Sequence, residues 1–435
     1  MQKLWSILLL LCASLCAQAT VANAASTTEA DTPTLVLNPV VQWNRTLLVI
    51  VRTPGAQPAT IHSTRSFAIT HAAIYDAVNA IDKRHKAYLV TLPGVSPEAS
   101  QEAAAAAAAH EVLVGLYPAF KTPLDAELQQ SLAQIADGKN KTDGIAIGVA
   151  VADRTLALRS NDGSSASPVA YVFGTAPGDY QSTPPNFAPQ PQFTHWSHVV
   201  PFALKSSNQF RPGPPPRLTG DDYADAFDEV KSLGIANSTT ATADEALTGR
   251  FWNGAIQNYW NEITQTASQA HNLTTAENAR LFALLNLSFA DSVIAFYDAK
   301  YTYNFWRPVT AIRAAGADDN PATLPDPAWL PEVGKTAPDP SYPGAHAVIS
   351  AAGAEVLGSF FGRDRFDFDV TSEVLPGAVR SFPSFSAAAE EATLSRIFGG
   401  QHFRFDLTTG HRLGRETGDF VFDNFLGVRD TDGSF

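Results

Sequence analysis

Apolar side chains recur every three or four residues along most of the chain, which is the period of an amphipathic α-helix. The segment 66–81 shows this period, and the alanine-rich segment 100–117 ends before Pro118. Strand-like alternation of apolar and polar residues is scarce, so the pattern predicts an all-α protein. Further helices are expected over residues 123–136, 144–159, 219–233, 243–266, 275–303, 347–361, 386–398 and 405–425.

The helical pattern stops between residues 161 and 216, where Pro, Gly and Ser become frequent. A flexible linker between domains would contain few aromatic residues, but this segment is rich in them. We therefore expect a structured loop that packs over the helices. The predicted organisation is a single all-α domain at 25–435, with an N-terminal helical half at about 35–218 and a C-terminal half at about 219–435.

The first 24 residues have the features of a secretory signal peptide. Lys3 precedes an apolar stretch that ends near Cys16, and Ala22, Asn23 and Ala24 form a small-x-small cleavage site. Cleavage there predicts an exported protein, periplasmic or extracellular, and an uncleaved anchor is the alternative. No later run reaches the roughly 18 uninterrupted apolar residues of a membrane-spanning helix, so no membrane span is expected.

Composition adds two constraints. Met1, Cys12 and Cys16 are the only sulfur-containing residues and lie in the predicted signal peptide, so the mature chain would lack the side chains that peroxide and hypohalous acid oxidise most easily. This favours an oxidising environment, although avoidance of Cys is ordinary in exported proteins. The chain has a formal net charge of −13 and no Lys/Arg-dense run, which argues against a nucleic-acid partner.

Three short segments in the C-terminal third contain residues suited to binding an anion. In the first, Lys300 and Arg307 are separated by almost two helical turns. Both cations would point the same way if the helix continues to Arg307, while Pro308 predicts a break or a new helix at that point. Taken alone, the segment favours two solvated cations on an amphipathic helix.

The second segment, residues 340–346, precedes a helix of small residues. With Pro343 at the first helical position, the N–H groups of Gly344, Ala345 and His346 would lack intrahelical acceptors and could bind an anion. His346 would then be placed to donate a proton to that anion. A lone His at such a position is more often a capping or packing residue.

The third segment, residues 395–406, contains a glycine pair followed by a His–Asp pair. Gly399 and Gly400 are expected to end a helix and to let the backbone approach a ligand. His402 and Asp406 are four residues apart, so the carboxylate can bond one imidazole nitrogen and leave the other facing the site. Alone, this is an ordinary surface pair.

Read in order, the segments give Lys-x6-Arg-Pro, Pro-x-x-His and Ser-Arg-x5-His-x3-Asp. This order resembles the signature shared by vanadium-dependent haloperoxidases and the type 2 phosphatidic acid phosphatase superfamily. The wider chain is similar to the exported bacterial haloperoxidase-like branch. The resemblance spans residues 300–406 and implies a large helical-bundle domain of the vanadium haloperoxidase and acid phosphatase type.

The resemblance also implies roles for individual residues. His402 would be the vanadium ligand of a peroxidase or the nucleophile of a phosphatase, and Asp406 would orient it. His346 would be the acid–base residue. The oxygens of vanadate or phosphate would be bound by three cations, which are Lys300, Arg307 and Arg396.

The second segment departs from the Pro-Ser-Gly-His pattern that is usual in these families. Here the residues are Pro343, Gly344, Ala345 and His346, so a hydroxyl donor is missing at Gly344 while the N–H of Ala345 can remain. Loss of one charge-assisted hydrogen bond costs about 1.5–3 kcal/mol. We therefore expect weaker retention of vanadate or altered activity.

These observations lead to one expected function and two alternatives. The expected function is that of a vanadate-dependent haloperoxidase-like enzyme, which oxidises a halide with hydrogen peroxide. The first alternative is a secreted acid phosphatase that hydrolyses phosphomonoesters at the same site without vanadate. The second is an oxyanion-binding protein that has lost catalysis. The sulfur-free mature chain favours the peroxidase, and the sequence indicates neither the halide nor an oligomeric state.

Overall fold

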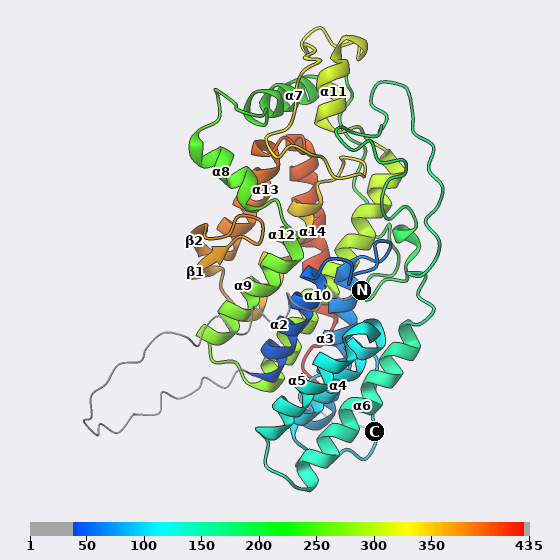
Figure 1. Cartoon of the computed structure of the whole chain (residues 1–435), viewed down its shortest axis with the longest axis vertical. Coiled ribbons are helices and arrows are strands. Elements are labelled where there is room, and N and C mark those ends of the chain that lie inside the picture. The colour runs from blue at the N-terminus through cyan, green and yellow to red at the C-terminus, as the bar shows by residue number, and fades with distance from the viewer. Residues whose placement is uncertain (1–37, 430–435) are drawn as a thin grey trace, which may run out of the picture. The chain divides into compact units, whose positions relative to one another are not determined.

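The computed structural model describes residues 38–429. The predicted signal peptide, with Met1, Cys12 and Cys16, lies outside the described residues, so export stays a prediction. The N-terminal half contains α2 (Pro39–Arg52), α3 (Ser63–Asp82), α4 (Gln101–Leu116), α5 (Lys121–Ala133) and α6 (Lys139–Arg159), with short 3-10 turns at Pro118–Phe120 and Trp196–His198 (Figure 1).

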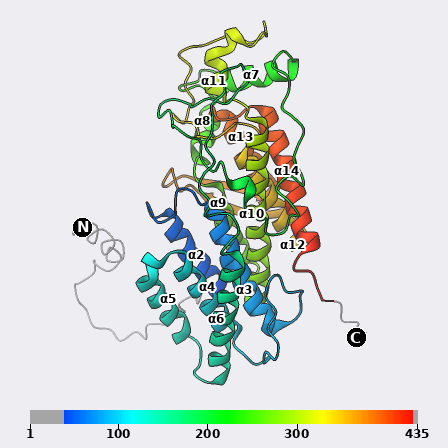
Figure 2. The ribbon, with the colours of Figure 1, turned by 90° about the vertical axis from the view of Figure 1, so that its right-hand side faces the viewer.

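The C-terminal half contains the remaining helices of the described chain and one β-hairpin. Its elements are α7 (Asp221–Leu233), α8 (Ala243–Phe251), α9 (Ile256–Ala270), α10 (Thr275–Tyr303), α11 (Pro308–Ala314), a 3-10 turn (Ala315–Ala317), α12 (Ala345–Phe361), β1 (Arg365–Thr371), β2 (Val379–Ser384), α13 (Phe385–Phe398) and α14 (Arg404–Asn424). In Figure 2, α2–α6 gather at one end and α7 and α11 lie at the other.

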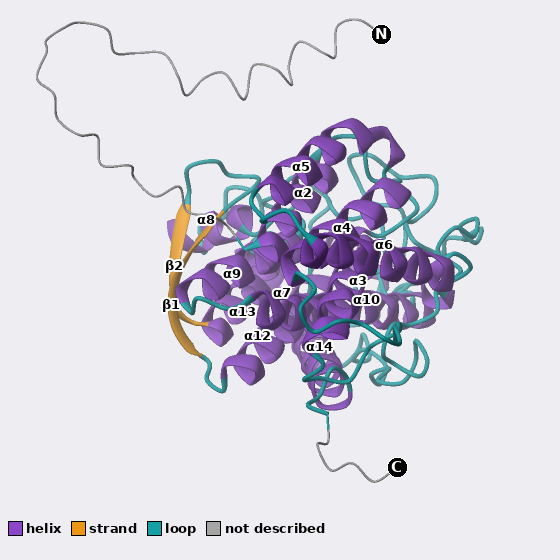
Figure 3. Ribbon diagram, turned by 90° about the horizontal axis from the view of Figure 1, so that it is seen from below, coloured by secondary structure: helices purple, strands orange, loops and turns teal. Residues whose placement is uncertain are grey.

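The predicted all-α class is confirmed, and α10 has the predicted bounds. Three features differ from the prediction. The expected helix 243–266 is two helices, because the chain leaves the helical path between Trp252 and Ala255 and the N–H of Ala255 donates to Glu373 (2.6 Å). Helix α2 was not predicted, and α11 is the new helix that was one of two alternatives at Pro308. The antiparallel hairpin β1–β2, which lies at the edge beside α8 and α9 in Figure 3, was not predicted either.

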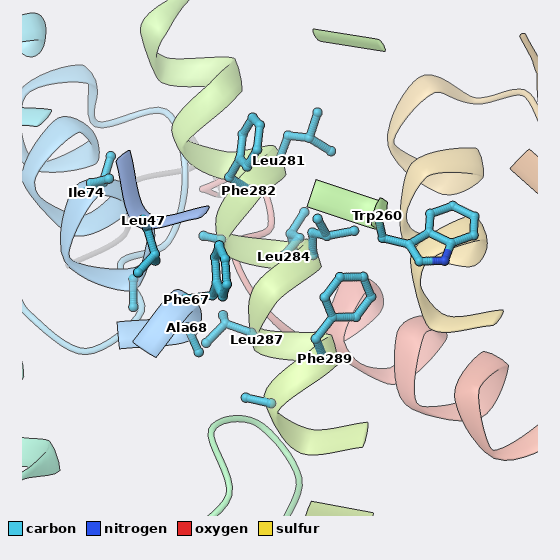
Figure 4. Close-up of a cluster of buried hydrophobic side chains, with 14 of the residues drawn as sticks. Leu47, Phe67, Ala68, Ile74, Trp260, Leu281, Phe282, Leu284, Leu287 and Phe289 are labelled. Atoms are coloured by element: carbon cyan, nitrogen blue, oxygen red, sulfur yellow. The ribbon is translucent and has the colours of Figure 1, made fainter. Parts of the chain in front are cut away.

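Helix α10 forms the centre of the main hydrophobic core. Its Leu281, Phe282, Leu284, Leu287 and Phe289 meet side chains of α2, α3 and α9 (Figure 4). Among the described residues it is also the one helix long and apolar enough to cross a membrane, but 94% of its apolar window is buried inside the protein. This burial on all sides is typical of a core helix.

The aromatic-rich segment between α6 and α7 is a structured loop, as predicted. Its Tyr180 and Trp196 are buried, and Asp291 on α10 accepts hydrogen bonds from three consecutive backbone N–H groups of the loop, those of residues 202–204, at 2.6–2.7 Å. Near the end of α10, the hydroxyl groups of Tyr301 and Tyr303 donate to loop carbonyl groups. The loop therefore covers the C-terminal end of α10.

Helices α12 and α14 run parallel and pack with their backbones in contact. Gly410, Gly414 and Gly418 of α14 face α12, and a Cβ at Gly414 would lie 2.0 Å from the carbonyl oxygen of Val348. No side chain fits there, so glycine is required for this approach. The N-terminal ends of the two helices therefore lie side by side, and the N–H of Gly344 donates to the carbonyl of Asp406 (3.0 Å).

Replacing Gly414 by Ala should lower the free energy of unfolding by about 1–3 kcal/mol or more, because the added methyl group forces α12 and α14 apart. Urea unfolding measured by circular dichroism tests this. The matched control is Gly358→Ala in α12, where a Cβ meets no atom within 4 Å. That variant should be unchanged or more stable by up to about 1 kcal/mol. Equal stability of the two variants would contradict the packing argument.

Candidate functional site

The residues predicted from three separate segments lie together at one buried position. Lys300 is in the last turn of α10, Arg307 caps α11, Arg396 is in the last turn of α13, and His402 directly precedes the cap of α14. Their exposed fractions are only 0%, 1%, 5% and 3%, respectively. Three cationic side chains and a histidine are therefore gathered in the interior of the protein.

A turn of the chain between Lys300 and Arg307 places the two residues near each other. Helix α10 ends at Tyr303, and Asn304 takes a left-handed conformation (φ 48°). The continuous helix considered for this segment is therefore wrong, whereas a new helix does begin at Pro308 with Arg307 as its N-cap. The turn brings both cations towards the same carboxylate.

That carboxylate belongs to Asp339, which the sequence analysis missed. The guanidinium of Arg307 donates to Asp339 Oδ1, and Lys300 Nζ lies 3.6 Å from the same oxygen. Burial alone would raise the pKa of Asp339, but the charges of Lys300 and Arg307 outweigh it and hold the pKa below its usual value. Burial also lowers the pKa of Lys300 to about 8. The one signal in the sequence was the position of Asp339 directly before the second segment, between two prolines.

His402 is held in one orientation because each of its two ring nitrogens has a hydrogen-bond partner. Nδ1 lies 3.0 Å from Asp406 Oδ2, and Nε2 lies 3.0 Å from a terminal nitrogen of Arg307. A guanidinium can only donate, so Nε2 is the acceptor and the proton of the neutral ring is on Nδ1. Burial, and then the charges of Arg307 and Lys300, lower the pKa of His402 well below its usual value. The lone pair on Nε2 therefore faces the cations.

Asp406 is fixed from several sides. Its Oδ2 accepts hydrogen bonds from the hydroxyl of Ser341 (2.5 Å) and from the N–H of Phe403 (3.1 Å), in addition to His402. Burial raises the pKa of Asp406 to about 6. Ser341 was not singled out in the sequence, although its hydroxyl links the second segment to the third.

His346 and Arg396 are both held by the turn between α8 and α9. His346 Nε2 lies 2.9 Å from the carbonyl oxygen of Trp252, so Nε2 carries the proton and Nδ1 is the acceptor of the neutral ring. Burial and the charge of Arg396 lower the pKa of His346 well below its usual value. Arg396 donates to Asn253 (3.2 Å), and burial lowers its pKa to about 9. This turn was not predicted, because the helical pattern of residues 243–266 continues through it.

The start of α12 differs from the prediction. The helix begins at Ala345 with Gly344 as its N-cap, so Pro343 lies outside the helix. The N–H of Gly344 donates to the carbonyl of Asp406, which is a consequence of the close approach of α14. The predicted set of three free N–H groups is therefore reduced to those of Ala345 and His346, which as first-turn groups lack intrahelical acceptors.

The space beside Gly344 is filled by a neighbouring side chain. A Cβ at Gly344 would lie 2.8 Å from Leu407 Cδ2 and 3.6 Å from His402 Nδ1. At this position, where the sequence predicts that a hydroxyl donor is missing, the apolar side chain of Leu407 from α14 lies next to His402.

The arrangement suits an anion with several oxygen atoms. Three cations and the N-terminal end of a helix surround one neutral imidazole nitrogen. Arg396 Nε is buried and has no hydrogen-bond partner among the described residues, so a donor remains for a ligand. Within residues 38–429 no group of three or more His, Cys, Asp or Glu residues could hold a metal cation. The site therefore has cationic and N–H donors of the kind that suit a tetrahedral oxyanion, and one neutral imidazole nitrogen beside them.

Comparison with known proteins gives consistent results. Residues 280–430 match the family model described as the VCPO second helical-bundle domain. Vanadium chloroperoxidase of Curvularia inaequalis is 24% identical over 467 residues, which cover 81% of this chain and 75% of that protein. The crystal structure of a bacterial vanadium-dependent iodoperoxidase is 28% identical, with a TM-score of 0.75, covering 91% of this chain and 97% of that one.

A bacterial vanadium-dependent chloroperoxidase has the same fold at lower sequence similarity. Its holo-type crystal structure is 16% identical with a TM-score of 0.64, and the match covers 90% of this chain and 93% of that chain. The helical-bundle architecture expected from the sequence is confirmed by these likenesses.

His346 and His402 should both remain unprotonated at pH 6.5 in the native protein, because their pKa values are lowered from the usual 6.5. Nitrogen-15 NMR of labelled histidine, assigned with His346→Asn and His402→Asn variants, measures this directly. The expected spectra show a proton on Nδ1 of His402 and on Nε2 of His346. In concentrated urea the same rings should titrate near pH 6.5. Protonation of either ring at or above pH 6.5 in the native protein would contradict this assignment.

Proposed function

We propose that this chain, which is related to the vanadium haloperoxidases along most of its length, is a vanadate-dependent haloperoxidase. It is an oxidoreductase of the haloperoxidase type, whose substrates are hydrogen peroxide and a halide. The observation that carries the proposal is the buried group of three cations around the neutral Nε2 of His402. Such a group combines strong binding of an oxyanion with a nitrogen ligand for its central atom.

The cations and the histidine have separate tasks in binding vanadate. The oxygen atoms would be bound by Lys300, Arg307, Arg396 and the N–H of Ala345, and the vanadium by Nε2 of His402. Arg307 would transfer one hydrogen bond from His402 Nε2 to the oxyanion, which leaves that lone pair free. The Nε of Arg396, which has no hydrogen-bond partner in the part of the chain that the structure describes, supports the fit. When bound, vanadate supplies the activation of hydrogen peroxide towards attack by a halide.

The remaining side chains control protons. His346 is neutral, and its Nδ1 is the acceptor for the proton that hydrogen peroxide loses. Because Asp406 accepts a hydrogen bond from Nδ1–H of His402, it keeps the ring in the tautomer that presents Nε2 to the oxyanion. Export through the signal peptide predicted at residues 1–24 is part of this proposal, since it would bring the enzyme into an oxidising environment.

Purified protein supplied with orthovanadate should oxidise bromide with hydrogen peroxide. His402→Ala removes the proposed vanadium ligand and should lower this activity by about 100-fold or more, since loss of an outer-shell partner alone costs roughly 10–100-fold. The assay is halogenation of a chromogenic acceptor, with and without added vanadate. His411→Ala is the matched control, because His411 lies within α14, the helix that follows His402, and outside the cation group, so the change should leave the activity unchanged.

Hydrolysis of a phosphomonoester is measured on the same preparation without vanadate. Hydrolysis without bromination, inhibited by vanadate, would replace the peroxidase by the acid phosphatase. Tight vanadate binding without either activity would indicate an oxyanion-binding protein. Bromination that persists in His402→Ala would refute the assignment of the site.

A further inference from the structure

Two of the three cations at the site are already paired with an acidic group of the protein itself. Arg307 bonds Asp339 twice, once through Nε to its carbonyl oxygen (2.8 Å) and once through a terminal nitrogen to its carboxylate. Lys300 Nζ approaches the same carboxylate oxygen (3.6 Å). Asp339 is 3% exposed, so water screens these interactions little.

The third cation, Arg396, is not paired with a carboxylate among the described residues. Arg396 bonds the neutral amide of Asn253, and its Nε is without a partner within residues 38–429. Asp406, the other acid at the site, accepts from Ser341, Phe403 and His402, all neutral donors. Asp339 is therefore the carboxylate that pairs directly with two of the cations proposed to bind an oxyanion.

Asp339 is held firmly in this position. The segment 338–340 reads Pro-Asp-Pro, and the N–H of Gln192 in the covering loop donates to the carbonyl of Pro338 (2.9 Å). The side-chain amide of Gln192 also lies near Asp339 Oδ2 (3.5 Å) and the hydroxyl of Tyr297 (3.4 Å). The carboxylate is therefore braced by neutral polar groups on the side away from the cations.

We propose that Asp339 is an internal counter-anion that limits the affinity of this site for tetrahedral oxyanions. Its carboxylate and the oxygen atoms of the ligand compete for the same donors on Lys300 and Arg307, and the two negative charges repel each other in a buried environment. The inference rests on the oxyanion site of the proposed function, but not on the peroxidase reaction. Asp339 acts through the cations and is a positioning residue.

Isothermal titration calorimetry with inorganic phosphate, repeated with orthovanadate, tests this on the full folded chain. Asp339→Asn should bind phosphate at least about tenfold more tightly than the unmodified protein, because the variant keeps the shape of the side chain and removes its charge. Asp339→Glu keeps the charge and should stay within about threefold of the unmodified protein. A purely structural role for Asp339 would instead make binding weaker in Asp339→Asn.

Asp162→Asn provides a matched control. Asp162 is also a buried carboxylate shared by two cations, Arg65 and Arg159, but these lie in the N-terminal half. The same change of charge there should leave phosphate affinity unchanged. A gain in both variants would mean that the net charge of the protein, and not Asp339, governs binding, and would overturn the proposal.

Thermal unfolding with and without phosphate covers the case in which Asp339→Asn folds poorly. Without a counter-anion the variant should unfold at a lower temperature than the unmodified protein, and saturating phosphate should raise its midpoint by more. A variant that stays unfolded in saturating phosphate, or binds phosphate no more tightly, overturns the proposal. If neither the unmodified protein nor any variant, Asp339→Asn included, binds an oxyanion, the proposed oxyanion site itself is refuted. If all of them bind it equally well, only the role of Asp339 as a counter-anion is refuted.

Discussion

The close parallel packing of α12 against α14 is the constraint on which the site depends. Gly410, Gly414 and Gly418 allow the backbones to touch over three successive turns, and this fixes both the register and the direction of the two helices. Because the helices are parallel, their N-terminal ends, each with a partial positive charge, lie at the same place. His346 and His402 come from these two ends. The position of the chemistry therefore follows from a stripe of residues without side chains.

The place where the N-terminal ends of α12 and α14 meet would be unstable if its charges had no partners, because three cations and two helix ends are gathered there in the interior. The protein meets this cost mainly with neutral acceptors. Backbone carbonyl groups of Pro340, Ser341 and Gln401 accept from Lys300 and Arg307. Asp339 supplies one negative charge, and the long loop after α6 covers the group and braces Asp339. The loop is thus part of the site although it supplies none of the predicted ligands.

The sequence predicted those parts of this arrangement that rest on local patterns. The helical period gave most of the helices, and the spacing of His402 and Asp406 predicted the hydrogen bond that orients the imidazole. The parts that it missed depend on contacts between distant segments. The turn at 252–255 interrupts an otherwise helical pattern, and Asp339 meets its cations across more than thirty residues. The glycine spacing in α14 is visible in the sequence, but its meaning requires the helix that it faces.

The same cations that attract an oxyanion also prepare the nitrogen that would bind its central atom. A histidine ligand must be unprotonated, and protonation competes with ligation. Burial together with the charges of Arg307 and Lys300 lowers the pKa of His402, while Nδ1–H on the opposite side of the ring donates a hydrogen bond to Asp406. Removing positive charge from the group would therefore weaken anion binding and also make the imidazole easier to protonate. The same buried positive charges therefore strengthen anion binding and keep His402 unprotonated as a ligand. This double effect explains why the cations are buried so completely.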